Sequence, residues 1–257
     1  MDRVDTADTH TEPVFRIDVA PYRVYGADRP RQVLVVCEHA SAHIPAELDD
    51  LGLEPRHRHS HAAWDIGAEA LSARLAERLE APLIVAGLSR LLLDLNRPVG
   101  APDSIPSLVE VVEVPRNRDV PQSEREARAA ALYHPFHGAV EDRLDAMQAP
   151  VLVTVHSFTP VWHGTPRETR IGLLHDADPA LARAMLAHGN DRAGVELNAP
   201  YSAADGVTHT IALHGTARGI PNVMIEVRND LLGDEAGTEA IADELLEMLL
   251  PAIEEVA

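Results

Sequence analysis

Short, continuous apolar runs rich in β-branched residues are the feature that most constrains the fold of this chain. The clearest are Gln32–Cys37 (QVLVVC), Val151–Val155 (VLVTV) and Asn222–Val227 (NVMIEV). Apolar and polar positions do not alternate in them, which is typical of strands buried on both faces of a parallel sheet. Such a chain must cover both faces of its sheet with helices.

Segments with helical spacing lie between these runs. Asp65 stands at an N-cap position, and apolar residues then recur at helical spacing to about Glu80. Ser123 and Glu126 have the spacing of a capping box, which predicts a second helix. We expect Pro135 to kink or break that helix, because proline has no N–H to donate.

Shorter apolar runs complete the pattern. LIVAGL, LLLDL and IGLLH predict three further strands, and helical patterns follow Asp178-Pro179 and Gly237-Thr238. Strands that alternate with helices are typical of an α/β sandwich. No internal repeat interrupts this pattern.

The chain is expected to form one domain with a short arm. Residues 1–30 are polar and contain three prolines, which predicts a loosely held arm, whereas residues 31–257 show no linker-like change and predict a single domain. A hydrophobic share of 46% over 257 residues can bury a large core. Residues 101–121 are irregular and rich in proline, and loops of this length are usually functional or mobile. Whether they close over a site is left open.

The composition excludes several mechanisms, because all 22 basic residues are Arg and the chain contains no Lys. Schiff-base enzymes, Ser-Lys hydrolases and P-loop nucleotidases need a lysine amine, and Arg cannot lose a proton to replace it. The chemistry must therefore use carboxylates, histidines, arginines, hydroxyls or a metal ion. Imidazoles are well supplied, with 14 His in the chain.

Net charge and cysteine content restrict the partners and the compartment. A formal charge of −19 repels phosphate backbones and anionic lipids, so neither nucleic acid nor a membrane surface is an expected partner. No apolar stretch approaches the roughly 18 residues of a membrane span, and the N-terminus has no apolar signal-like run. Cys37 is the only cysteine, which excludes an internal disulfide and a cysteine-rich zinc module. The cytoplasm is the expected location.

Polar residues cluster at the ends of the apolar runs. His39, Asn96, His156 and Glu226 each lie at or near the C-terminal end of a run, where open α/β sheets collect ligands. Taken alone, each of them is also explained as an ordinary loop residue that forms hydrogen bonds. Together, two histidines and a carboxylate can form a zinc site with an open fourth position, beside which a separate Glu can take a proton from water.

Several ordered segments resemble the N-formylglutamate amidohydrolase family, over about residues 32 to 232. They are CEHASAHIP, SRLLLDLNRP, YHPFH, VTVHSFTP, NAPYSAADGVTHT and MIEVRNDLL. Within them DLNR, HSF and EVR are also similar, in the same order, to motifs of the zinc carboxypeptidases. The resemblance implies a three-layer αβα sandwich with a mixed, mostly parallel central sheet. It also implies one zinc ion (Zn²⁺) and hydrolysis of an amide on an N-acylated amino acid.

Roles for individual residues also come from this resemblance. It implies that His39 and His156 are metal ligands and that Glu226 is the catalytic carboxylate. Asn96 and Arg97 match a pair that grips the free carboxylate of the substrate, which suits the fork of a guanidinium. Arg90 is expected to polarise the scissile carbonyl and to stabilise its oxyanion.

The chain departs from the carboxypeptidase pattern at two positions. Ala42 stands where those enzymes have a carboxylate ligand, so the third ligand must come from elsewhere. Asp65 is the first choice and Glu38 the second, although Asp65 equally suits a plain helix N-cap. Phe158 replaces the carboxypeptidase loop tyrosine and offers no hydroxyl.

Other polar residues keep two interpretations each. His134 and His137 flank Pro135 and either line a pocket or cap the broken helix. A second group lies in family-like segments and either contacts substrate or forms local hydrogen bonds; its members are Asp205, His209 and His214. Arg228 is expected to bind a second substrate carboxylate or to keep Glu226 ionised. A further tract is expected to be a solvated loop, namely His57, His59 and His61.

These observations predict a zinc-dependent amidohydrolase that removes a small acyl group from an acidic N-acyl amino acid. The best candidate is the formyl group of N-formylglutamate, so the partner is a small-molecule N-acyl amino acid substrate. A related metallo-carboxypeptidase or deacylase is the alternative, and a noncatalytic small-molecule-binding module of the same fold is a second. The identity of the divalent metal and the oligomeric state are left open.

Overall fold

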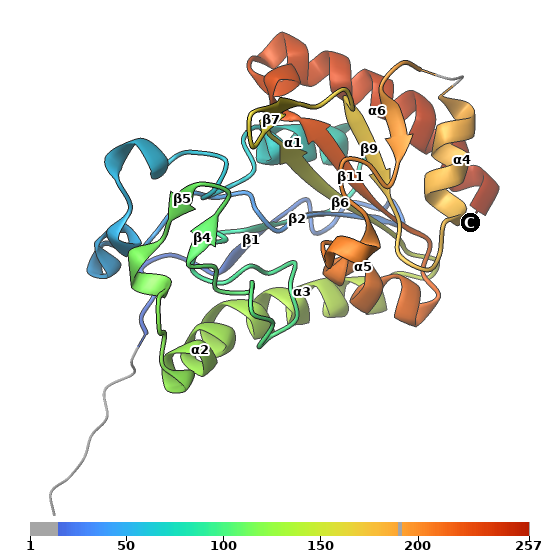
Figure 1. The fold of residues 1–257 in the computed structure, drawn as a ribbon. Coiled ribbons are helices and arrows are strands. Elements are labelled where there is room, and N and C mark those ends of the chain that lie inside the picture. Colours follow the sequence, from blue (N-terminus) through green and yellow to red (C-terminus); the bar gives the residue numbers. More distant parts are fainter. Residues whose placement is uncertain (1–14, 190–191, 257) are drawn as a thin grey trace, which may run out of the picture.

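A mixed sheet of seven strands forms the centre of the molecule in the computed structural model, which describes residues 15–189 and 192–256 (Figure 1). The strands run in the order β1-β3-β2-β6-β11-β9-β10. Their bounds are β1 Tyr22–Tyr25, β2 Val33–Cys37, β3 Leu83–Ala86, β6 Val151–Phe158, β9 Ile171–Leu174, β10 Val195–Leu197 and β11 Asn222–Arg228.

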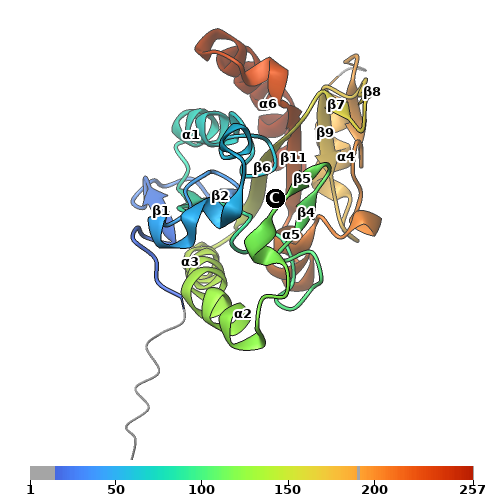
Figure 2. The ribbon, with the colours of Figure 1, turned by 60° about the vertical axis from the view of Figure 1, so that its left-hand side comes forward.

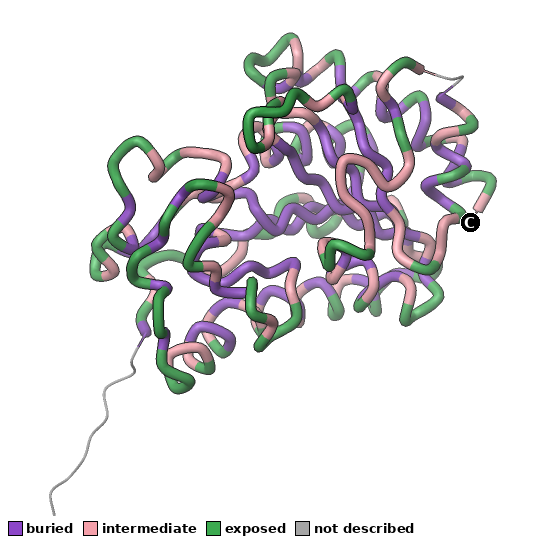
Figure 3. Tube along the Cα trace, in the orientation of Figure 1, coloured by how far each residue is buried: buried purple, intermediate pink, exposed green. Residues whose placement is uncertain are grey.

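Most neighbouring strands in the sheet are parallel. β2 pairs in parallel with β3 and β6, β6 with β11, and β9 with β10. The antiparallel pairs are β1 with β3 and β9 with β11. Every residue of β2, β3 and β6 is buried, as the runs without alternation predicted (Figure 3).

Helices cover both faces of the sheet, so the expected three-layer αβα sandwich is confirmed (Figure 2). On one face lie α1 Ala68–Arg78, α4 Ala180–His188 and α6 Glu235–Val256. On the other lie α2 Gln122–Arg128, α3 His134–Asp145 and α5 His209–His214. Alternate strand residues enter the two cores: Val33 and Val35 pack towards α1, and Leu34 and Val36 towards α3.

The α2–α3 segment differs from the expected broken helix. A π-helical turn, Ala129–Tyr133, joins α2 to α3 without interruption, and Pro135 lies in the first turn of α3. The wider turn accommodates the missing proline N–H, so the chain continues as a helix. The expected capping box is wrong, because α2 begins at Gln122 directly after Pro121.

The predicted strand LLLDL is also wrong. Leu91 and Leu92 are fully buried, but this stretch forms turns and pairs with no strand among the described residues. Its backbone is satisfied locally, since the Leu92 amide donates to the Ser89 carbonyl at 3.0 Å and the Asp94 amide to the Ser104 carbonyl at 2.8 Å. Asp94 and Asn96 therefore project from a buried loop and not from a strand end.

Two further stretches bear on the expected organisation. Tyr22–Tyr25, within the expected arm, forms the edge strand β1, while residues 1–14 lie outside the described residues. The irregular segment 101–121 contains a small hairpin of β4 Leu108–Val109 and β5 Val112–Glu113. A second hairpin, β7 Val161–Trp162 with β8 Thr165–Pro166, precedes β9. None of the helices in the described part of the chain is both long and apolar enough to cross a membrane.

Candidate metal and substrate site

The central strands bring the predicted site residues together. Glu38 and His39 follow β2 directly, while His156 in β6 and Glu226 in β11 are register partners in adjacent parallel strands. Both therefore point to the same face of the sheet, the one opposite the valines that pack on α1 and α6. His39, His156 and Glu226 are all buried.

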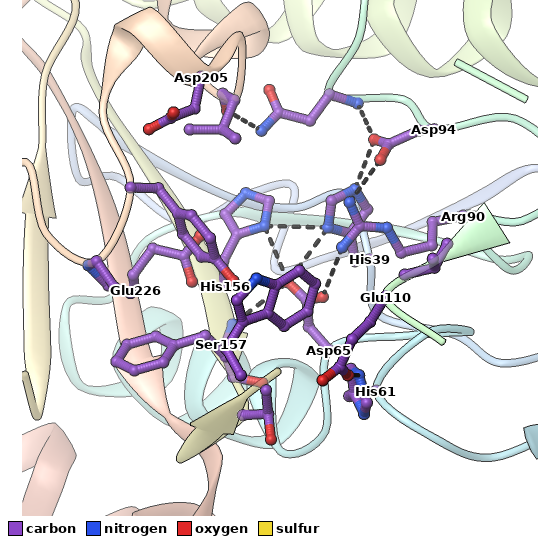
Figure 4. A pocket seen from close by; sticks show the side chains of 18 of the residues that line it. His39, His61, Asp65, Arg90, Asp94, Glu110, His156, Ser157, Asp205 and Glu226 are labelled. Atoms are coloured by element: carbon purple, nitrogen blue, oxygen red, sulfur yellow. Dashed lines mark hydrogen bonds and ion pairs between the residues drawn. The ribbon is translucent and has the colours of Figure 1, made fainter. Parts of the chain in front are cut away.

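Asp65 joins the two histidines in a compact group. Its Oδ2 lies 3.2 Å from His39 Nδ1 and 3.0 Å from His156 Nδ1, and the two Nδ1 atoms are 3.2 Å apart (Figure 4). These separations are close to the ~3.3 Å between neighbouring ligands on a tetrahedral ion with bonds of about 2.0–2.1 Å. The group can hold a metal ion.

Two further carboxylates lie beside the outer nitrogens of the two histidine rings. Asp94 Oδ1 lies 2.7 Å from His39 Nε2, and Glu38 Oε2 lies at ion-pair distance, 3.1 Å, from His156 Nε2 but outside hydrogen-bond geometry. Because ionised carboxylates only accept, a neutral ring places its proton on Nε2 and leaves the Nδ1 lone pair directed at Asp65. The lone pairs of His39 Nδ1, His156 Nδ1 and Asp65 Oδ2 then converge on one point. A cation at that point would be stabilised by all three.

The electrostatics of the group lead to the same conclusion. Burial lowers the pKa of both histidines, but the surrounding carboxylates outweigh burial and raise the pKa of His39 above and that of His156 well above the ordinary value. The pKa of Asp65 is lowered, against the effect of burial, chiefly by His39. The group therefore favours positive charge at its centre, whether a proton or a metal ion.

The structure contradicts the helix-cap interpretation of Asp65. Gly67, and not Asp65, is the N-cap of α1, and no side chain caps that helix end. The Asp65 carboxylate instead contacts the two histidines, the Ser157 amide at 3.3 Å and Arg90 at 3.2 Å. Glu38, the second choice, lies behind the His156 ring, on the side away from Asp65.

Glu226 has the surroundings of a proton-transfer group. Its Oε2 is buried and has no hydrogen-bond partner among the described residues. Burial raises the pKa of Glu226 to about 7; the nearby histidines lower it and Asp65 adds to the rise. A carboxyl that titrates near neutral pH can both accept and return a proton.

Arg90, the expected oxyanion-stabilising residue, and Arg97, the expected carboxylate-binding residue, line the cavity but already have carboxylate partners. Arg90 bridges Asp65 at 3.2 Å and Asp94 at 2.6 Å (Figure 4), and these acids raise its pKa despite burial. Arg97 Nε donates to Asp103 at 2.6 Å, and its Nη1 to the Asn96 carbonyl at 2.9 Å.

Asn96 lines the cavity and anchors its wall. Its Nδ2 donates to the Val207 carbonyl, and its Oδ1 accepts from the Thr210 amide at 2.9 Å. Asp205 also lines the cavity, where its carboxylate accepts from the Ser202 amide at 2.8 Å and caps a short 3-10 turn.

Four expected histidines lie outside this cavity. His137 Nδ1 is 2.9 Å from His214 Nε2, and its Nε2 donates to the Leu95 carbonyl at 2.9 Å. His209 Nε2 lies 2.7 Å from the Tyr133 hydroxyl, and His134 lines a separate small cavity beside α2. Local hydrogen bonding is thus the interpretation that the structure favours for His209 and His214. His137, expected to line a pocket or to cap the helix, bonds His214 and the Leu95 carbonyl, and His134 lines only the small cavity beside α2.

Two further expectations differ from the structure. Arg228 does not line the cavity; it pairs with Asp230 at 2.8 Å and donates to the Arg167 carbonyl at 2.9 Å. His61, expected in a solvated loop, lines the cavity and bonds Glu110 Oε2 at 3.0 Å. Glu110 also accepts from the His163 amide, so the β4–β5 hairpin is tied across the mouth of the cavity to β7–β8.

The cavity has a volume of about 560 Å³, within the range of small-molecule sites. Its walls include side chains that sequence reasoning did not single out, among them Trp162, Arg167 and Tyr201. They come from the β7–β8 hairpin and from the loop before α5. Arg167 lies outside every family-like segment, so no sequence signal marked it.

The fold and the site together define a hydrolase of amides built on an αβα sandwich. Comparison with protein families gives the particular assignment: the N-formylglutamate amidohydrolase family profile matches residues 31–233, and the chain belongs to this family. Among curated proteins, the comparison found no match.

Two solved structures share the fold. The gene product Atu2144 from Agrobacterium tumefaciens is 44% identical, with 93% of this chain and 96% of that chain covered and a TM-score of 0.90. An N-formylglutamate amidohydrolase from Ralstonia eutropha JMP134 is 20% identical, with 93% and 98% covered and a TM-score of 0.67. At 20% identity, the similarity to the second structure supports a shared fold only.

Proposed function

We propose that this protein is a zinc-dependent amidohydrolase that releases formate from an N-formyl acidic amino acid such as N-formylglutamate. The observation that carries the proposal is the convergence of three buried lone-pair donors, from His39, Asp65 and His156, beside the unpaired carboxylate of Glu226. Membership of the N-formylglutamate amidohydrolase family supports the formyl substrate.

His39, Asp65 and His156 would hold the ion. Two imidazole nitrogens and one carboxylate oxygen are a ligand set that Zn²⁺ favours in catalytic sites, where a fourth position stays open. When bound, the ion supplies Lewis acidity that polarises the amide carbonyl and makes water a better nucleophile. Asp94 and Glu38 orient the two rings.

Glu226 would move the proton. It takes a proton from the attacking water, whose oxygen bonds to the formyl carbon. It then returns that proton to the nitrogen as the C–N bond breaks, so formate and the free amino acid leave. Burial keeps the Glu226 carboxylate poorly solvated and therefore basic enough for the first step.

Arg90 and Arg97 would act on the two ends of the substrate. Arg90, held in place by Asp65 and Asp94, presents fixed positive charge where the oxyanion develops. Arg97 would exchange its contact with the exposed Asp103 for the α-carboxylate of the substrate.

The buried Cys37 has no disulfide partner, which supports a cytoplasmic location.

Formate release and metal content test this proposal. Purified protein is expected to contain one zinc per chain and to release formate from N-formylglutamate faster than it cleaves N-acetylglutamate, N-succinylglutamate or a dipeptide. Fastest cleavage of one of the other substrates would assign a deacylase or carboxypeptidase instead. Protein without a bound divalent ion, and with no hydrolysis after zinc is added, would indicate a noncatalytic binding module.

A further inference from the structure

Among the arginines that line the cavity, one lacks a carboxylate partner. Arg90 is held by Asp65 and Asp94, and Arg97 by Asp103. In contrast, Arg167 forms no ion pair with any carboxylate of residues 15–189 and 192–256. Arg167 therefore brings a positive charge without a carboxylate partner to the wall of the cavity.

Three aromatic rings, and not acids, surround Arg167. Its guanidinium carbon lies 5.3 Å from the ring centre of Phe158, 5.1 Å from that of Trp162 and 4.7 Å from that of Tyr201. Aromatic faces stabilise a guanidinium through the ring quadrupole and leave its charge unneutralised. All three rings line the same cavity, so this cationic wall faces the space that the substrate would occupy.

The N–H donors of Arg167 are also largely available. A guanidinium carries five N–H groups; Nη1 donates to the Thr159 carbonyl at a long 3.3 Å, and the Tyr201 hydroxyl also interacts with the guanidinium, which leaves further N–H groups for a ligand. Arg167 is partly buried among these rings, and a partly buried cation with spare donors binds an anion more strongly than a fully solvated arginine does. In a chain with a net charge of −19, such a local cation is needed to attract an acidic ligand.

Neighbouring groups hold Arg167 in position. Its backbone amide donates to the Pro160 carbonyl at 2.9 Å, and its own carbonyl accepts from Arg228 Nη1 at 2.9 Å. Arg228 is in turn anchored by Asp230. Arg228 thus supports the backbone of Arg167 from outside the cavity, whereas the sequence suggested that it binds a substrate carboxylate or keeps Glu226 ionised.

We propose that Arg167 forms an anion subsite that binds the side-chain carboxylate of an N-acyl dicarboxylic amino acid, with Phe158, Trp162 and Tyr201 as its walls. The inference rests on the proposed hydrolase function and adds the basis of its selectivity. Arg97 remains available for the α-carboxylate, so the two carboxylates of one substrate have separate partners. A substrate with a neutral side chain would leave the partly buried cation of Arg167 without an anion.

Paired substrates test the subsite. We would measure kcat/KM for N-formylglutamate and for its neutral isostere N-formylglutamine in the wild type, Arg167→Gln and Arg167→Lys. We expect Arg167→Gln to lose about 10- to 100-fold on N-formylglutamate but less than about threefold on N-formylglutamine, as for loss of one charge-assisted contact. Arg167→Lys is expected to restore part of the glutamate preference, because it keeps the charge but loses the planar fork.

Arg183→Gln is the matched control. Arg183 is exposed on α4 and lies outside the cavity lining, so this change alters net charge by the same amount and is expected to leave both substrates unaffected. Equal losses on both substrates in Arg167→Gln would overturn the subsite and indicate a structural role. A wild type that does not prefer N-formylglutamate over N-formylglutamine would overturn it as well.

Equilibrium binding separates failure of the subsite from failure of the hydrolase function. Calorimetric binding of L-glutamate and L-glutamine is expected to favour glutamate in the wild type and to lose that preference in Arg167→Gln. If no formate is released from either substrate but this binding difference persists, the hydrolase proposal fails and the subsite stands. If formate is released and binding shows no such difference, the subsite fails and the hydrolase proposal stands.

Discussion

Glu226 illustrates how one residue acquires its chemistry from its position. A glutamate is normally ionised at neutral pH, but burial raises the pKa of this one to about 7 and leaves Oε2 without a partner among the described residues. Its neighbours in space, His156 and Asp65, come from β6 and from the turn before α1. The proton affinity of Glu226 is thus a property of the assembled site.

Replacing Glu226 by Gln tests its role at this scale. The amide has nearly the same shape but cannot take a proton, so we expect kcat for formate release to fall by about 10²–10⁴ while bound zinc is retained. Formate assays and elemental analysis of the same preparations measure both effects. Glu254→Gln, on the exposed side of α6, is the control and should behave as the wild type. Near-normal turnover by the Glu226 variant would refute the proposed proton transfer.

At the scale of elements, a pair of buried histidines joins two helices on the site-bearing face of the sheet. His137 of α3 and His214 of α5 stack with ring centres 5.1 Å apart and share a hydrogen bond of 2.9 Å. Burial lowers the pKa of His137 to about 4 and that of His214 to about 3, and their mutual repulsion when protonated lowers the pKa of His214 further. Both are therefore neutral in the folded protein near pH 7.

The free energy of unfolding is expected to depend on these two rings below pH 6.5. Their pKa values in the folded protein lie below the ordinary 6.5, so the unfolded chain binds protons first as pH falls. Their contribution is then lost progressively from pH 6.5 down to about 4 for His137 and about 3 for His214, and it is constant above pH 6.5. Denaturant titrations of metal-free wild type and His214→Asn measure this effect. The stability difference between the two should shrink over that window, and a pH-independent difference would contradict the assignment.

At the scale of the whole molecule, the proposed metal ligands come from distant parts of the chain. His39 follows β2, Asp65 precedes α1 and His156 lies in β6, so the group exists only when the sheet and its crossover are assembled. The unfolded chain has no comparable site. Metal binding and folding are therefore coupled, and bound metal should stabilise the native state by mass action.

Removal of the metal tests this coupling. Free zinc at about 100 times its Kd contributes about 2.7 kcal/mol, which corresponds to a Tm shift of roughly 5–10 °C for a domain of this size. We expect chelation to lower Tm by that amount and zinc to restore it. Asp65→Asn replaces the anionic carboxylate ligand by a neutral amide, so the Tm of this variant should change much less on chelation or on addition of zinc. A wild-type Tm that is insensitive to both would argue against a metal ion at His39, Asp65 and His156.

The sequence by itself determined the layered sheet and the approximate place of its site. Runs such as VLVTV cannot leave either face exposed to water, and parallel strands bring their carboxyl ends to one edge, so His39, His156 and Glu226 could be placed together before any coordinates. The run LLLDL carried the same local signal but packs as a buried loop, because burial alone does not specify a hydrogen-bonded strand partner.

Only the tertiary structure decided how side chains that share a local pattern differ in role. Asp65 suited both a helix cap and a ligand, and its contacts with two histidines from other strands separate the two interpretations. Arg228 was expected to bind a substrate carboxylate or to keep Glu226 ionised, but it pairs with Asp230 outside the cavity, whereas Arg167, which no sequence signal marked, lines the cavity among aromatic rings. Local sequence encodes periodicity and propensity, whereas partners distant along the chain set the direction, burial and charge of each side chain.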